Sequence, residues 1–335
     1  MLCLFLLSLV LFGCETNKGK KMAFFHWKDT FKVTNFEKKC LSQLGTSDLF
    51  LRVFDLTLDS SKTNVIPSNF VTVSDTLSAF SIIPVIFIDK STLANINIEN
   101  VNALAIKTAL KIKSMMNEKS IVFNKLMIDY NWDAAESNVY FNLLKCLEKA
   151  LPNVEIIAAL RYNQAVELRK YGVLPTKHNL VYFYNYLKID ANLSKNNMLE
   201  DSLAQIYADA IAAYPNSFSL ALPIYSWALQ IRADKVINTL PRRIKSDFEN
   251  NDLFFVSNYS FLVSKDSNYK GIEFKKGDLI KVESAKYSQL SSVAAIVKKS
   301  IRSTKLKQIV FFDLDFLNFN QFDIDSIKLV NEQCF

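Results

Sequence analysis

The segment Leu126–Asn131, with the sequence LMIDYN, is a short apolar run that ends in aromatic and polar residues. About seven similar runs recur along the chain, and most are separated by amphipathic stretches long enough for a crossover helix. This alternation is typical of a parallel sheet, and a count of eight strands predicts that the sheet closes into a (β/α)8 TIM barrel. The eight predicted strands are Ala23–Trp27, Leu49–Asp55, Ile82–Asp89, Leu126–Asn131, Glu155–Arg161, Leu180–Asn185, Ser219–Trp227 and Gln308–Asp315.

The functional groups of such a barrel lie at the carboxyl ends of its strands, where the following loops form the mouth. Most of the predicted strands end in acidic, amide, basic or aromatic residues, which makes these residues the first candidates for a site. They are Trp27, Asp55, Asp89, Asp129, Asn131, Arg161, Asn185, Trp227, Asp313 and Asp315.

The length and composition indicate one folded domain. The chain has 335 residues, of which 50% are hydrophobic and 22% are charged. One barrel takes roughly 250 residues and tolerates insertions, so we expect a single TIM-barrel domain over residues 22–335. The composition argues against disorder and against a protein with several membrane spans. The net charge of +7 comes mostly from scattered lysines, which predict a solvated surface and no nucleic-acid partner.

The amino terminus has the pattern of an export signal. Residues 2–12 form an uncharged apolar run that is too short to span a bilayer and has the length of a signal-peptide h-region. The run ends in Leu11-Phe12-Gly13-Cys14, which resembles a bacterial lipobox and implies that a lipid on Cys14 anchors the protein to a membrane of the cell envelope. We therefore expect a signal peptide over residues 1–13 and a tether over 14–21. The alternative is a cleaved secretory signal in which Cys14 has no role.

Several other chemistries lack their residues in this chain. Cys40, Cys146 and Cys334 are widely spaced and predict no disulfide framework. The two histidines, His26 and His178, predict no zinc centre, and we expect neither a metal nor a cofactor, although carboxylates could still hold a hard cation. None of the six glycines lies in a GxSxG, GxGxxG or P-loop pattern, which argues against serine hydrolases and nucleotide-binding proteins.

Three amphipathic helices are expected to cover the barrel, at Asn100–Met116, Ser137–Ala150 and Leu199–Ala213. The eighth helix should be short or missing, because only residues 324–335 follow the last strand.

The region between the seventh and eighth strands is longer than one crossover needs. It predicts an insertion at about 232–305, with strands at Phe254–Val263 and Leu279–Val282. Such an insertion overhangs the carboxyl face, so it would form a wall or lid of the site, or else a decorative subdomain.

The fourth predicted strand carries the most informative row of polar residues. Alternation places Asp129, Asn131 and, if the strand continues, Asp133 on one face, with Trp132 on the other. This row resembles the strand-four motif of chitinase-like glycoside hydrolases, Asp-x-Asp-x-Glu, in which the last Glu is the general acid. The resemblance implies that Asp129 orients or stabilises and that the acid is Asp133, Glu136 or a carboxylate from elsewhere.

The carboxylates from elsewhere are Asp55 and Asp313, at the ends of the second and eighth predicted strands.

The departures from the motif favour a second hypothesis. Asn131 cannot take up the proton that the second Asp would handle, and Asp133 is one methylene shorter than the acid Glu. This barrel could therefore bind a sugar without cleaving it. Capping of the following helix is an alternative role for Asp55, Asp89 and Asp133.

A second resemblance covers most of the chain. Phe-His-Trp-Lys at 25–28, Arg-Val-Phe-Asp at 52–55 and Asp-Tyr-Asn-Trp at 129–132 are similar to segments of a family of uncharacterised bacterial barrel lipoproteins. This resemblance implies a fold and a location in the envelope, and no activity.

A carbohydrate is the partner that these residues favour. Trp27, Trp132, Tyr184 and Trp227 offer flat apolar faces with polar edges for stacking on sugar rings, although a place in the core is an alternative for Trp132 and Trp227. Arg161 could hold an acidic sugar. Asn131 and Asn185 add amides for hydrogen bonding. The sequence therefore predicts a lipid-anchored envelope protein that recognises a carbohydrate, with hydrolysis, binding alone and a scaffold role as competing hypotheses.

Overall fold

The computed structural model describes residues 21–90, 92–94, 96–186, 188–249, 251–257 and 259–335. The predicted signal peptide, Cys14 and the tether up to residue 20 lie outside the described residues. In the described part of the chain, no helix has both the length and the apolar character that crossing a membrane requires.

Eight parallel strands form a closed barrel. They are hydrogen-bonded in the order β1-β3-β6-β7-β8-β9-β10-β18, and β18 pairs with β1, so the sheet has no open edge within the barrel. This arrangement confirms the predicted (β/α)8 barrel. The strands are β1 (Met22–His26), β3 (Asp48–Leu58), β6 (Ser81–Ile88), β7 (Lys125–Tyr130), β8 (Glu155–Leu160), β9 (His178–Tyr182), β10 (Ser217–Pro223) and β18 (Leu306–Phe312).

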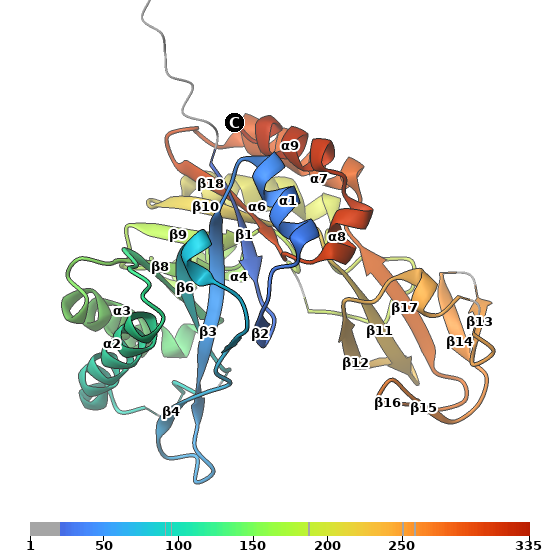
Figure 1. Cartoon of the computed structure of the whole chain (residues 1–335), viewed down its shortest axis with the longest axis horizontal. Helices are drawn as coiled ribbons and strands as arrows, with labels where there is room; N and C mark the ends of the chain where they lie inside the picture. The colour runs from blue at the N-terminus through green and yellow to red at the C-terminus, as the bar shows by residue number, and fades with distance from the viewer. Residues whose placement is uncertain (1–20, 91, 95, 187, 250, 258) are drawn as a thin grey trace, which may run out of the picture.

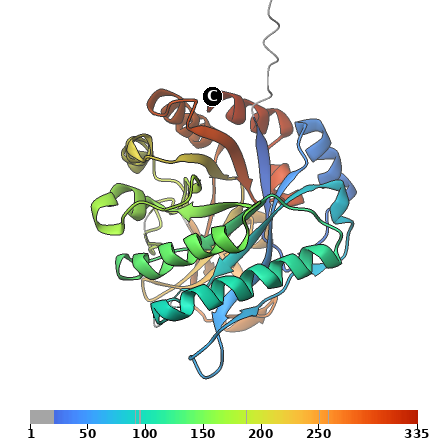
Figure 2. The same cartoon turned by 90° about the vertical axis from the view of Figure 1, so that its left-hand side faces the viewer.

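Helices surround this barrel, as Figure 2 shows. The three predicted helices are present as α2, α3 and α6, and the last strand is followed by two short helices, α8 and α9. The helices are α1 (Asn35–Leu44), α2 (Val101–Glu118), α3 (Ser137–Ala150), α4 (Tyr162–Val166), α5 (Leu168–Tyr171), α6 (Asp201–Ala213), α7 (Tyr287–Ser300), α8 (Phe316–Gln321) and α9 (Ile324–Gln333).

The crossover from β3 to β6 has no α-helix among its described residues. It contains β4 (Val65–Ser68), which pairs antiparallel with β3, then β5 (Thr72–Val73) and a 3-10 turn at Leu77–Ala79. Strand β5 pairs with β2 (Thr30–Phe31), which follows β1.

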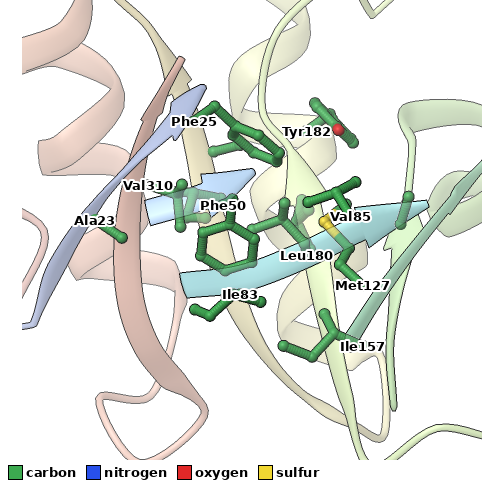
Figure 3. Packing of buried hydrophobic residues seen from close by; sticks show 14 of the residues in the cluster. Ala23, Phe25, Phe50, Ile83, Val85, Met127, Ile157, Leu180, Tyr182 and Val310 are labelled. Carbon is green, nitrogen blue, oxygen red and sulfur yellow. The ribbon is translucent and has the colours of Figure 1, made fainter. Parts of the chain in front are cut away.

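Large apolar side chains fill the barrel interior, as Figure 3 shows. The ring of Phe25 lies 5.1 Å from that of Phe50 and 6.1 Å from that of Tyr182, so β1, β3 and β9 meet at the axis. Met127 of β7 is fully buried in the same core. Burial of each such side chain contributes about 1.5–3 kcal/mol. The candidate site residues at the carboxyl ends of the strands lie above this layer.

The seventh barrel strand is shorter than predicted. A continuous strand over Ser219–Trp227 is wrong, because β10 ends at Pro223 and Trp227 lies in a separate strand, β11 (Ser226–Arg232). After Ile224, whose N–H still bonds to the carbonyl of Phe312, the chain leaves the barrel and pairs antiparallel with other strands.

Strand β11 begins an inserted sheet that lies beside the barrel in Figure 1. The sheet spans Ser226–Ser284, whereas the insertion was expected at about 232–305; the later part of that range holds α7, which lies against α6 and α9. Residues 254–263 form a hairpin and not one strand. The other strands of this sheet are β12 (Lys235–Pro241), β13 (Phe254–Ser257), β14 (Ser260–Val263) and β17 (Leu279–Ser284), and β15 (Ser267–Tyr269) and β16 (Ile272–Phe274) form a separate two-stranded sheet.

The inserted sheet has the strand order β12-β11-β17-β14-β13 and a small core of its own. Phe248, Phe254 and Phe261 pack together there, with ring centroids 5.0 Å and 5.6 Å from Phe248. This core stabilises the inserted sheet, which carries Trp227, Pro241 and Arg242 at the barrel mouth.

Two buried histidines make the stability of the fold dependent on pH. The pKa of His26 in β1 and that of His178 in β9 are both lowered from 6.5 to about 4, first by burial and then by neighbouring positive charges. Nε2 of His178 lies 2.9 Å from the hydroxyl of Ser219. Both rings are therefore neutral in the folded protein near neutral pH.

We expect the free energy of unfolding to fall as the pH is lowered from 6.5 to about 4. In this window protons bind to both histidines of the unfolded chain but not to those of the folded chain. When the pH reaches the lower end of the window, the free energy of unfolding has fallen by roughly 3 kcal/mol per histidine. Urea unfolding at several pH values measures the slope, and His178→Gln should remove about half of it. A stability that stays constant across this window would contradict the expectation.

Candidate functional site

A cavity of about 490 Å³ opens at the carboxyl ends of the barrel strands. Its lining comes from seven barrel strands or the residues just after them and from the inserted sheet, and more than half of the lining residues are aromatic. The lining residues are Trp27, Phe87, Asp129, Arg161, Tyr182, Tyr184, Asn185, Tyr225, Trp227, Pro241, Arg242, Phe312 and Asp313.

A buried carboxylate lies at the base of this cavity. Asp129, at the end of β7, is 2% exposed, and each of its oxygens accepts a hydrogen bond. Arg161 Nη2 donates to Oδ1 at 2.5 Å, and the Tyr182 hydroxyl donates to Oδ2 at 2.7 Å. Arg161 also donates to the carbonyl of Tyr130 at 3.1 Å and lies over the Tyr182 ring. Three neighbouring strands therefore meet in one ion-paired network.

This network affects the protonation of its members. Burial lowers the pKa of Arg161, but the charge and hydrogen bond of Asp129, together with Tyr182 and Tyr184, raise it by more, so the pKa lies above its ordinary value. Burial, followed by the charge of Asp129, raises the pKa of Tyr182 well above 10. Arg161 therefore stays charged, and Tyr182 stays a hydrogen-bond donor at any pH at which the protein is folded.

A second buried carboxylate faces the cavity from the eighth strand. Asp313 is 2% exposed and follows Phe312, to which it is joined by a cis peptide bond. Arg242, which follows β12 of the inserted sheet, donates to Asp313 Oδ2 at 2.6 Å, and Asn318 donates to Oδ1 at 2.9 Å. Arg242 also forms an ion pair with Asp315 at 3.4 Å. The insertion is thus tied to the barrel mouth by charge pairs.

The two tryptophans of the cavity wall are each held from behind. Arg52 lies 5.0 Å from the centre of the Trp27 ring and is in turn paired with the buried carboxylate of Asp55. The indole N–H of Trp227 donates to Glu283 at 2.7 Å. Both rings therefore keep fixed orientations without a ligand, which lowers the entropic cost of binding a ligand against them.

The third wall comes from the residues after β9. Asn185 has a left-handed backbone with φ of +50°, and its N–H donates to the carbonyl of Met198 at 2.9 Å. The side-chain amide of Asn185 donates to the Tyr225 hydroxyl at 3.2 Å. Tyr184 packs edge-on against Tyr225, so this wall presents aromatic rings next to an amide.

The structure brings together seven of the sequence-predicted site residues and places six elsewhere. Among the six, Asp55 is buried behind Trp27, where Arg52 and the Asn69 amide bind it. The residues that line the cavity are Trp27, Asp129, Arg161, Tyr184, Asn185, Trp227 and Asp313. Those that do not are Asp55, Asp89, Asn131, Asp133, Glu136 and Asp315.

The row that continues from Asp129 leaves the barrel mouth. Strand β7 ends at Tyr130, and a 3-10 turn over Ala134–Glu136 begins directly after Asp133. Glu136 accepts from the backbone N–H of Asp133 at 2.8 Å, and the Asp133 side chain is 62% exposed. The strand therefore does not continue to Asp133, and the structure places Asp133 in the alternative role, as the cap of the following helical turn.

Asn131 and Trp132 also lie outside the cavity lining. Asn131 is exposed and lies 3.3 Å from the Gln164 amide, outside the cavity lining. Trp132 is 1% exposed and packs against Tyr140 and Phe141 of α3. Trp132 is thus a core residue that joins β7 to α3.

Sequence reasoning missed Arg242, which follows an inserted strand and meets Asp313 only through the fold. It also missed Phe87, an apolar residue inside a strand, whose side chain is only partly buried.

Within the described residues, no group of three or more His, Cys, Asp or Glu side chains is arranged to hold a metal ion.

Comparisons with known proteins relate this chain to others by structure. Neither the family models nor the curated protein sequences give a match. Among solved structures, the Bacillus cereus spore cortex-lytic enzyme SleL matches with a TM-score of 0.54 at 8% identity, over 95% of this chain and 76% of that one. The chain shares its barrel fold.

A family GH18 chitinase from Cycas revoluta, solved with allosamidin, matches with a TM-score of 0.50 at 12% identity, over 93% of this chain and 99% of that one. A chitinase from Rhizomucor miehei gives a TM-score of 0.50 at 9% identity, over 92% and 99%. At these identities the likeness concerns the (β/α)8 barrel and not the reaction.

We expect Asp129→Ala to lower the free energy of unfolding by about 3 kcal/mol, because it leaves the Arg161 guanidinium without its buried counter-charge. Denaturant unfolding measures the change. The double variant Asp129→Leu/Arg161→Met should recover most of the loss, since an apolar pair can replace a buried ion pair. Asp133→Ala is the matched control and should cost no more than about 1 kcal/mol, because it removes only an exposed cap of the 3-10 turn. Equal effects of the two single alanine variants would contradict the ion-pair role.

Proposed function

We propose that this protein binds a carbohydrate in the cavity at the barrel mouth and does not hydrolyse it. One observation carries the proposal: the cavity is walled by aromatic rings, while each of its two carboxylates is bound by an arginine of the protein. The aromatic walls favour a sugar ligand, and the paired carboxylates argue against acid catalysis.

The walls of the cavity have the chemistry that sugars need. Sugar rings present apolar C–H faces and polar hydroxyl edges, which fit aromatic faces with polar tips. Trp27, Tyr184, Tyr225 and Trp227 supply such rings, and the Asn185 amide lies among them. A volume of about 490 Å³ falls in the range of small-molecule sites, roughly 300–1,000 Å³. These features support the recognition of a short stretch of a glycan.

Hydrolysis would need a different arrangement of carboxyl groups. Most glycoside hydrolases use two carboxyl groups, one of which donates a proton to the leaving oxygen while the other attacks or activates water. Both oxygens of Asp129 and both oxygens of Asp313 already accept hydrogen bonds from protein donors. No third Asp or Glu lines the cavity among the described residues. This arrangement favours binding over bond cleavage.

The structural neighbours support a carbohydrate ligand by analogy. SleL is a spore cortex-lytic enzyme, and the neighbours from Cycas revoluta and Rhizomucor miehei are chitinases. Fold likeness alone does not transfer an activity, because barrels carry many chemistries. The analogy therefore guides the choice of chitohexaose and soluble peptidoglycan fragments as test glycans, and laminarihexaose is added as a glucan for comparison.

The proposal includes a place for the protein in the cell envelope. The lipobox-like segment Leu11-Phe12-Gly13-Cys14, preceded by an apolar run, supports a lipid anchor on Cys14. The described fold begins at residue 21, only a few residues later, so the barrel would lie close to the membrane surface.

We expect the protein to bind at least one of these glycans in titration calorimetry and to release no reducing ends from it during prolonged incubation. Trp27→Ala should weaken binding by roughly tenfold or more, since an aromatic contact of this kind is worth about 0.5–1.5 kcal/mol beyond its buried area. Phe36→Ala is the matched control, because this ring is 48% exposed on α1 and does not line the cavity.

Two results would count against this function. Reducing ends that appear with the unmodified protein and disappear with Asp313→Asn would make it a hydrolase. The absence of binding to every glycan would remove the carbohydrate role altogether.

We expect Cys14→Ser to move the protein from the membrane fraction to the soluble fraction of expressing bacterial cells, because a thioether-linked lipid needs the cysteine. Metabolic labelling with an alkyne fatty acid, followed by mass spectrometry, measures the lipid directly. Cys40→Ser is the control, since Cys40 is buried in the barrel domain and should leave the label in place. Equal labelling of the two variants would contradict lipidation at Cys14.

A further inference from the structure

A buried ion pair lies in the inserted sheet, directly behind the cavity wall. Lys281 and Glu283 on β17 are each 4% exposed, and Lys281 Nζ lies 2.5 Å from Glu283 Oε1. Burial of two opposite charges is costly unless every donor and acceptor finds a partner. The surroundings of this pair therefore indicate what it holds together.

The partners of Lys281 come from the chain between β9 and α6. Its ammonium donates to the carbonyl of Asn192 at 2.7 Å and to the carbonyl of Lys195. Glu283 Oε1 also accepts from the side-chain amide of Asn197 at 2.9 Å and from its backbone N–H at 3.2 Å. The pair thus fastens the loop after the sixth barrel strand to the inserted sheet, across more than 80 residues of sequence.

The other oxygen of Glu283 reaches the cavity wall. Oε2 accepts from the indole N–H of Trp227 at 2.7 Å. Trp227 on β11 and Glu283 on β17 are directly opposite in the antiparallel register, so their side chains leave the same face of the sheet. Trp227 lines the cavity, whereas Glu283 does not. Glu283 is therefore the link between the loop, the insertion and the aromatic wall.

A buried ion pair adds little stability compared with apolar residues of the same size, but it does impose a geometry. An indole has one donor, so an acceptor fixed behind the ring sets both its position and its tilt. Without that acceptor, a buried N–H would be left unpaired, and the ring would turn to find water or another partner. Loss of Glu283 should therefore change what the cavity presents to a ligand.

We propose that Glu283 is a positioning residue for the carbohydrate site, which it serves by orienting Trp227 while Lys281 holds it and the loop in place. This inference rests on the proposed carbohydrate binding. It adds a residue outside the cavity that controls affinity without touching the ligand.

The test compares two double variants of the full chain. Lys281→Met/Glu283→Leu replaces the ion pair by apolar residues and removes the acceptor, while Lys281→Met/Glu283→Gln removes the charges and keeps an oxygen for the indole. Calorimetry measures affinity for chitohexaose, laminarihexaose and peptidoglycan fragments. Proton–nitrogen correlation spectra report the indole N–H of Trp227, assigned with Trp227→Phe.

We expect the Leu variant to bind roughly tenfold more weakly, with a shifted Trp227 indole resonance, and the Gln variant to stay within about threefold of the unmodified protein. Equal affinities of the two folded variants, or an indole resonance that does not move in the Leu variant, would overturn the positioning role. No binding by the unmodified protein would instead be a failure of the proposed function, and the ligand role of Glu283 would fall with it.

A measurement without substitution covers the case in which a variant does not fold. Hydrogen exchange of the Trp227 indole N–H in the unmodified protein should be slow, both free and saturated with glycan, because the Glu283 bond persists in both states. Fast exchange in the glycan-bound state would overturn the inference.

Discussion

The ion pair between Arg161 and Asp129 is the interaction on which the barrel mouth depends. A carboxylate 2% exposed above a core of phenylalanine and methionine must be paired, and Arg161 and Tyr182 satisfy both of its oxygens. Because the three residues come from β7, β9 and the residue after β8, their bonds fix the relative heights of adjacent strand ends. They also occupy the oxygens that proton transfer would need. The same interaction therefore stabilises the base of the cavity and is the basis of the proposal that the protein binds a glycan without cleaving it.

The upper part of the cavity depends on the insertion. Arg242 crosses from the inserted sheet to Asp313, and Glu283 fixes Trp227 from behind. Trp27, which directly follows β1, is held by Arg52. Both carboxylates and both arginines that line the cavity are paired with each other within the protein, and more than half of the lining residues are aromatic. The cavity therefore offers mainly apolar ring faces and few unpaired charges.

The sequence predicted the barrel because strand alternation and helix spacing are local signals, and LMIDYN carries both the buried run and the inward Asp129. It also predicted most of the wall, since residues at strand ends converge in any such barrel. It left two roles open for Asp133, and the choice depends on a 3-10 turn that begins where a continued strand would have carried this residue towards the mouth. Arg242 and Glu283 could not be predicted, since their partners lie about 70 and 56 residues away and only the folded insertion brings them together.

Saturation-transfer NMR on one sample of protein and chitohexaose tests the central claim most directly, because it reads contact and cleavage together. The account predicts saturation of the sugar-ring C–H protons from the aromatic walls, with no new reducing-end signals over a day. Laminarihexaose and peptidoglycan fragments complete the series if chitohexaose gives no transfer. Growing reducing-end signals, or no transfer to any of the three glycans, would contradict the account.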